Sequence, residues 1–218
     1  PPKRENELRQ FIGDAYFELE KYDSAVIFLN QFLTSRTGVH SDYYQLGFAL
    51  KQINEYEDAI KYLQKAIGEN DTINQSAYYF IGESSIKLDR KSSAKNAFRS
   101  AERISVNPSI KEDALFNYAK VSYELSYHPY DDAILAFEEY INKYPNSEKL
   151  ESAYEYLLGV YYTTKNYKEA LNSLNRIKSQ DYKLLEAKQR IALFRGVELF
   201  NTAEYNDAID LFKLSIKN

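Results

Sequence analysis

The 218-residue chain contains no cysteine, methionine or tryptophan, and it has only two histidines, His40 and His128. Without cysteine it can form no disulfide, thiolate nucleophile or cysteine-ligated metal site. The two histidines have no companion at metal-ligand spacing, and no glycine-rich phosphate loop is present. These absences argue against an enzyme, and they predict no metal site and no cofactor.

Long apolar runs are also missing, because no stretch approaches the roughly 20 residues that a membrane-spanning helix needs. The net charge is −4, from 28 basic and 32 acidic residues, so the chain lacks the positive excess typical of nucleic-acid-binding proteins. It begins with Pro1-Pro2-Lys3-Arg4, without an initiator methionine or a signal peptide. We therefore expect a fragment of a longer chain that neither binds nucleic acid nor spans a membrane.

Helix-breaking residues are scarce, with 7 glycines and 5 prolines, whereas tyrosine (21) and phenylalanine (12) are abundant. Pro108 and Pro145 fall between the helix pairs predicted below, and Pro129 falls in a turn. Because no proline interrupts a predicted helix, the composition favours long helices. Apolar residues make up 44% of the chain and charged residues 28%, which is typical of a folded, soluble protein.

Small residues recur at a regular spacing along the chain. One series repeats every 34 to 40 residues, and a second series follows it 11 to 14 residues later. Small side chains let two helices approach to about 8–10 Å, so each pair of positions predicts a crossing of two helices. The first series is Gly13, Gly47, Gly82, Ala119, Gly159 and Gly196, and the second is Ala25, Ala59, Ala94, Ala133, Ala170 and Ala208.

Large apolar residues surround these small residues at helical spacing. Steps of three and four residues separate them, which is typical of the buried stripe of an amphipathic helix. Short polar segments such as Asn54-Glu55-Tyr56-Glu57 predict a turn inside each helix pair. The position just before the first series is apolar in five of six cases: Ile12, Leu46, Ile81, Tyr118, Leu158 and Arg195.

The pattern resembles the tetratricopeptide repeat (TPR) family, best in the second repeat, from Tyr43-Tyr44-Gln45-Leu46-Gly47-Phe48-Ala49-Leu50 to Ala66-Ile67. This resemblance covers about residues 6–218 and implies an all-α, right-handed α-solenoid of about six helix-turn-helix hairpins, or about 12 helices. A single hairpin cannot bury its apolar face, so neighbouring repeats must stack. We expect one array over 1–218, with repeats at about 6–39, 40–74, 75–111, 112–151, 152–188 and 189–218.

The sequence departs from the family pattern at a few positions. Lys91 stands where the turn tyrosine is expected, and Ser85 and Ser122 stand where the family has a large residue. The turn at Leu125–Asp131 has two extra residues, and Arg195 replaces the usual apolar residue of the sixth repeat. These departures affect the local register and not the predicted architecture.

One segment is similar to the repeats of bacterial envelope TPR proteins, namely outer-membrane-assembly lipoproteins and the periplasmic coordinators associated with Tol-Pal. It runs from Phe137 to Ser147 and continues at Ala153-Tyr154. The similarity implies a scaffold in the periplasm or cell envelope, which we favour over the cytoplasm. Such lipoproteins need a lipidated N-terminal cysteine, so any anchor would lie outside this chain.

The family resemblance implies that the first helix of each repeat lines a concave groove. Aromatic residues at groove positions would bury apolar parts of a protein segment, and tyrosine hydroxyls would bond its backbone. Alternatively, the same rings pack against the next helix of a tightly wound array, and the sequence leaves both interpretations open. The predicted groove residues are Phe17, Tyr44, Phe48, Lys51, Tyr79, Phe116, Tyr123 and Tyr156.

Two charged patches are interpreted as solvated convex surface. Lys91, Lys95, Arg99 and Arg103 are each four residues apart and so share one helix face. The acidic pair Glu138-Glu139 is interpreted in the same way, because charge runs usually mark a solvated face.

The leading hypothesis is a non-enzymatic scaffold that binds a protein or peptide segment in its groove. One alternative is a regulatory or sensor module of a larger protein that carries an effector domain. Another is a self-assembly module, because the apolar side of the last predicted helix, residues 205–216, has nothing after it in this chain to cover it. Exposed apolar patches of this kind favour association with another copy.

Overall fold

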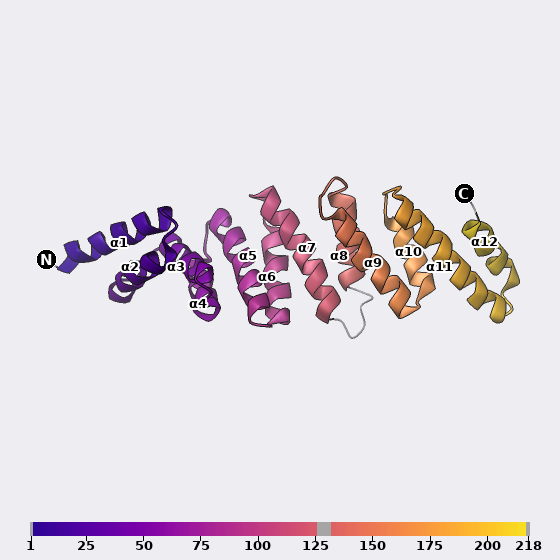
Figure 1. Ribbon diagram of the computed structural model, residues 1–218, viewed down its shortest axis with the longest axis horizontal. Helices are drawn as coiled ribbons and strands as arrows, with labels where there is room; N and C mark the ends of the chain where they lie inside the picture. The colour runs from indigo at the N-terminus through magenta and orange to yellow at the C-terminus, as the bar shows by residue number, and fades with distance from the viewer. Residues whose placement is uncertain (1, 126–131, 217–218) are drawn as a thin grey trace. The chain divides into compact units, whose positions relative to one another are not determined.

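A computed structural model describes residues 2–125 and 132–216, with the side chains of Pro2, Lys3 and Thr164 left out (Figure 1). The predicted turn at 125–131, with Pro129 and His128, lies outside these residues apart from Leu125. Within the described ranges the chain forms twelve α-helices and no strand, which confirms the all-α prediction. The chain divides into two compact units, Pro1–Val121 and Ser122–Asn218, which we call the N-terminal body and the C-terminal body.

The N-terminal body contains three helix pairs and most of α7 (Pro108–Leu125). Successive helices from α1 to α6 contact one another in chain order (Figure 1). Fully buried Ala25 and Leu29 of α2 meet Leu46 of α3, so apolar stripes from neighbouring hairpins share one core. The pairs are α1 (Pro2–Glu18) with α2 (Tyr22–Ser35), α3 (His40–Gln52) with α4 (Tyr56–Ala66), and α5 (Asp71–Lys87) with α6 (Lys91–Arg103).

The C-terminal body contains the end of α7 and five further helices. Its core includes three tyrosines that are at most 2% exposed. Tyr140 and Tyr154 satisfy their hydroxyls with Ser147 at 2.6 Å and Ser179 at 2.8 Å, which is what a buried hydroxyl requires. The third, Tyr161, is bonded to Ser173. The helices are α8 (Asp132–Lys143), α9 (Leu150–Thr164), α10 (Tyr167–Arg176), α11 (Tyr182–Asn201) and α12 (Tyr205–Ser215).

The close approach of two helices explains why four positions of the first small-residue series are glycine. A Cβ added at Gly47 would lie 2.7 Å from Leu63 Cγ and 2.9 Å from the Leu63 backbone nitrogen. Gly13, Gly82 and Gly196 are similarly crowded by the second helix of their own hairpin. The explanation is wrong for Gly159, where an added Cβ would meet no atom within 4 Å. The alanines of the second series are all at most 1% exposed.

In residues 2–125 and 132–216, five hairpin turns contain a non-glycine residue with a positive φ angle. At Asn54, where φ is 67°, the Asn54 amide donates to the Lys51 carbonyl and the Glu55 amide donates to the Leu50 carbonyl. This is the Schellman arrangement that ends a helix with a left-handed residue. It turns the chain from the first helix of a repeat into the second. The other four residues are Glu20, Asp89, Lys165 and Ala203.

Glu138 does not lie on a solvated surface, so that interpretation is wrong. Its side chain is 6% exposed, and the Arg176 guanidinium donates to both carboxylate oxygens, from Nε at 2.7 Å and from Nη2 at 2.8 Å. Ser173 donates to the same carboxylate. The hydrogen bonds from Arg176 to Glu138 raise the pKa of Arg176 above its usual value. The sequence conceals this ion pair because its two partners lie 38 residues apart.

Two of the basic residues of α6 interact with neighbouring side chains. The Lys95 ammonium lies 5.7 Å from the Tyr118 ring centroid, and the Arg99 guanidinium lies 4.9 Å from it. Arg99 also pairs with Glu102, which is buried, at 3.2 Å. This face of α6 is therefore packed in part against α7.

Candidate functional site

Aromatic rings form a continuous line of contacts across the N-terminal body. Phe17 of α1 lies 5.7 Å from Phe48 of α3, and Phe48 lies 5.0 Å from Phe80 of α5, measured between ring centroids. Tyr44 contacts both Phe48 (6.3 Å) and Phe80 (6.4 Å), and Tyr79 contacts Phe80 (5.7 Å). All five side chains are half-buried. We call Phe17, Tyr44, Phe48, Tyr79 and Phe80 the aromatic ladder.

Helix spacing places the ladder on one side of the first helices. Tyr44 and Phe48 are four residues apart in α3 and therefore share a helix face. α3 contacts both α1 and α5, so rings on that face meet rings of both neighbours. Phe80 was not among the predicted groove residues, because its place in the ladder depends on how α5 is rotated against α3. Repeat spacing alone does not fix that rotation.

Lys51 places a positive charge beside the ladder. Its ammonium lies 4.8 Å from the Phe80 ring centroid and 2.7 Å from Glu83 Oε2. The ring face and the carboxylate both stabilise a cation there. Burial raises the pKa of Tyr79, and the negative charges of Glu83 and Asp113 raise it further.

Carboxylates gather near the α1 end of the ladder. Burial raises the pKa of Asp14, and the charges of Asp42 and Glu18 add to this effect. Asp42 is fixed in place, because Gln10 Nε2 donates to its Oδ1 at 3.0 Å and the Val39 amide donates to its Oδ2 at 2.8 Å. Asp14 Oδ1 is buried and accepts no hydrogen bond. Ionisation of Asp14 therefore lowers the free energy of unfolding.

Replacing Asp14 by asparagine is expected to raise the free energy of unfolding at pH 7 by less than about 1 kcal/mol, because solvent screens a partly exposed group. Since the folded-state pKa is raised, the cost of ionised Asp14 is present above that pKa and absent below the ordinary aspartate pKa of about 3.9. The gain should therefore vanish at pH 3. Urea unfolding at both pH values measures it, with exposed Asp58→Asn as a control. An equal gain at both pH values would contradict the assignment.

The remaining predicted groove residues do not all join the ladder. Tyr123 and Tyr156 meet in the C-terminal body with ring centroids 5.5 Å apart, and Tyr156 stacks on Phe137 at 5.4 Å. Phe116 lies half-buried on α7. The structure thus brings Phe17, Tyr44, Phe48, Lys51 and Tyr79 into one connected surface. It places Tyr123 and Tyr156 in a second, smaller group.

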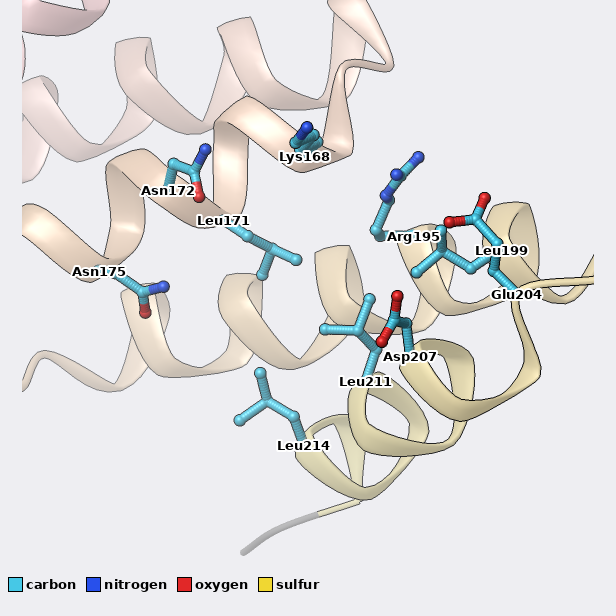
Figure 2. Close-up of a pocket in the computed structure, with 10 residues that line it drawn as sticks. All are labelled: Lys168, Leu171, Asn172, Asn175, Arg195, Leu199, Glu204, Asp207, Leu211 and Leu214. Carbon is cyan, nitrogen blue, oxygen red and sulfur yellow. The ribbon is translucent and has the colours of Figure 1, made fainter. Parts of the chain in front are cut away.

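The C-terminal body also contains a hollow of about 390 Å³ between α10, α11 and α12 (Figure 2). The side chains of Leu171, Leu211 and Leu214 point toward one another across it. Charged and amide groups surround this apolar floor. The lining residues are Lys168, Leu171, Asn172, Asn175, Arg195, Leu199, Glu204, Asp207, Leu211 and Leu214.

Neither surface has the residues of a metal centre. Among the described residues, no group of three or more His, Cys, Asp and Glu side chains is placed to hold a metal ion. His40 lies at the start of α3, near Gly68, and His128 lies outside the described ranges. None of the helices in residues 2–125 and 132–216 is long and apolar enough to cross a membrane.

Comparison with known proteins identifies the repeats. Tetratricopeptide repeat family models match residues 7–36, 43–72 and 113–147. The TPR repeat-containing protein MJ1428 of Methanocaldococcus jannaschii is 28% identical over 169 residues, which is 77% of this chain. The aligned part spans only 28% of the length of that relative.

Solved structures with the same fold include two that each cover most of this chain. The crystal structure of MamA gives a TM-score of 0.60 at 22% identity, covering 86% of this chain and 93% of MamA. That of YrrB, described as a TPR protein with an unusual peptide-binding site, gives 0.59 at 18% identity, covering 81% of this chain and 87% of YrrB. At these identities the likeness shows the fold, and it confirms the predicted stack of helix-turn-helix hairpins.

Proposed function

Because the chain belongs to the tetratricopeptide repeat family, we propose that it is a non-enzymatic scaffold whose aromatic ladder binds a segment of a partner protein. The observation that carries this proposal is the unbroken line of half-buried rings across α1, α3 and α5. Aromatic side chains are enriched at protein interfaces because they combine a large contact area with low conformational freedom. The peptide-binding site described for YrrB supports the same kind of role.

The ladder offers a bound segment apolar contact area and polar groups that would orient it. Apolar side chains of the segment would cover the exposed parts of the Phe48 and Phe80 rings. Lys51 and Glu83, which pair with each other beside the Phe80 ring, would meet its polar groups. Since the rings already hold one another in place, binding would immobilise few additional side chains, which lowers its entropic cost.

The test compares two adjacent tyrosines of α3. Peptides selected from a random 12-residue library on the wild-type protein are titrated against Tyr44→Ala and Tyr43→Ala by fluorescence anisotropy. Tyr43 stacks on Tyr62 at 6.5 Å and is not part of the ladder, so it controls for the loss of a tyrosine. We expect at least tenfold weaker binding for Tyr44→Ala and unchanged binding for Tyr43→Ala.

Two outcomes would contradict the ladder proposal. The first is equal affinity of both variants and the wild type, with folding verified by circular dichroism. The second is a library selection that yields no binding peptide. A selected peptide that loses affinity only with Tyr43→Ala would place the binding surface where Tyr43 packs on Tyr62.

Three more specific features of the function remain predictions from the sequence. They are a cell-envelope setting, a sensor module fused to an effector domain, and self-association through the C-terminal repeat. The last of these would use apolar residues of α12 and its end, where Ile209 is 48% exposed and Ile216 is 78% exposed.

A further inference from the structure

One apolar side chain fills the same place in the second and third repeats. It stands directly before the small residue of each first helix, as Leu46 does before Gly47. Leu46 is fully buried in a cluster with Ala25 and Leu29 of the preceding α2 and with Ala59 of its own partner helix α4. Ile81 is likewise packed in a cluster with Leu63 of α4 and Ala97 of α6. This side chain therefore fills the space between one hairpin and the second helix of the hairpin before it. We call a side chain at this position the plug.

The sixth repeat lacks this plug, because Arg195 stands at that position. The Arg195 guanidinium extends away from the leucines (Figure 2), and its Nη1 lies 3.0 Å from Glu198 Oε2 on the same helix. Arg195 instead lines the hollow of about 390 Å³. Its floor is made by leucines of the preceding second helix α10 (Leu171) and of α12 (Leu211), the helices that a plug contacts in other repeats.

Charges around the hollow are arranged with one sign on each side. Lys168 of α10 supplies positive charge, and Glu204 and Asp207 at the start of α12 supply negative charge, whereas the charge of Arg195 is paired with Glu198. Figure 2 shows Lys168 on α10 and Glu204 and Asp207 on the α12 side. A segment with an acidic residue at one end and a basic residue at the other matches this order.

We propose that the hollow receives a leucine-sized side chain from a helical segment of a partner protein, which supplies from outside the plug that other repeats supply from within. The hollow also has room for a second apolar side chain one helical turn along. The segment carries an acidic side chain beside the two apolar side chains, on the Lys168 side of the hollow. It carries a basic side chain on the Asp207 side. This site goes beyond the aromatic ladder, because it lies in the C-terminal body and uses none of the ladder residues.

The first test asks what occupies the hollow. The probe is a fluorescein-labelled, lactam-bridged 14-residue helix with two leucines four residues apart, glutamate before them and lysine after them. Anisotropy titration against the wild-type protein is expected to show saturable binding. Replacing both probe leucines by alanine, or exchanging the probe's glutamate and lysine, should weaken binding at least tenfold. No binding, or equal binding of the three probes, would overturn the proposal.

The second test fills the hollow from inside. Arg195→Leu restores the apolar residue type of the other repeats. The midpoint temperature of thermal unfolding of this variant should therefore rise by a few degrees, and its affinity for the probe should fall at least tenfold. Arg195→Ala removes the charge without filling the space and should change affinity less than threefold. Leu214→Phe fills part of the space with Arg195 intact and should also weaken binding. Unchanged probe affinity in Arg195→Leu and Leu214→Phe would overturn the assignment.

The same variants identify a different occupant. If the wild-type protein self-associates in sedimentation experiments and Arg195→Leu abolishes this, the occupant is a second copy of this chain and the partner assignment is wrong. A monomeric wild type that binds the leucine probe supports the proposal.

Discussion

Replacing Gly47 by alanine is expected to lower the free energy of unfolding by about 1 to 2 kcal/mol, because overpacking costs about 1–3 kcal/mol and the higher helix propensity of alanine returns about 1 kcal/mol. The new Cβ would lie 2.7 Å from Leu63 Cγ and 2.9 Å from the Leu63 backbone nitrogen. A side chain can rotate away from such a contact, whereas a backbone atom moves only with its helix. α3 and α4 must therefore separate, which also disturbs the buried Leu46 and Ala59.

Gly159 offers a matched control in the same repeat position. An alanine Cβ there would meet no atom within 4 Å, and glycine inside a helix costs about 1 kcal/mol relative to alanine. Gly159→Ala should therefore stabilise the protein slightly. Urea unfolding followed by circular dichroism measures both variants, and the two bodies of the chain should be fitted as separate transitions where the curves show them. Equal stabilities of Gly47→Ala and the wild type would contradict the close crossing of α3 and α4.

The contrast between these glycines shows what the sequence could predict about the fold. Regular spacing of small residues identified the repeats, because every hairpin needs a crossing and the crossing favours small side chains. Spacing could not show that Gly159 is free of contact, since that depends on the local separation of two helices. The left-handed turn residues were missed for a related reason. Lys165 and Ala203 are neither glycine nor asparagine, the residues that favour this conformation, so the sequence carries no signal for it there.

The candidate site was predicted in part. Tyr44, Phe48 and Lys51 recur at helical spacing on α3, and the structure brings them into one surface. Phe80 was missed, although it contacts Tyr44, Phe48 and Tyr79. Ring-to-ring contacts between hairpins depend on helix rotation, which a one-dimensional pattern of positions does not specify. The hollow beside Arg195 has a sequence signal, since Arg195 was visible as a departure, but its shape required the structure.

The buried ion pair of Glu138 leads to the second large expected effect. Replacing Arg176 by leucine should lower the free energy of unfolding by about 2 to 3 kcal/mol. Breaking a buried pair from one side typically costs 3–5 kcal/mol, and the 49% exposure of the Arg176 side chain lowers the value through solvent screening. Glu138, whose side chain is 6% exposed, would keep only its bond from Ser173.

Two further variants separate loss of charge pairing from loss of packing. Glu138→Gln in the Arg176→Leu background removes the unpaired charge and keeps an oxygen that can accept from Ser173, so it should restore more than half of the lost stability. Arg176→Lys retains the charge but cannot form two parallel hydrogen bonds, so it should cost about 1 kcal/mol. Urea unfolding of the four proteins at pH 7 gives the comparison. If the double variant is no more stable than Arg176→Leu, the cost comes from lost packing of the arginine stem between α8 and α10, and the electrostatic account of this contact is wrong.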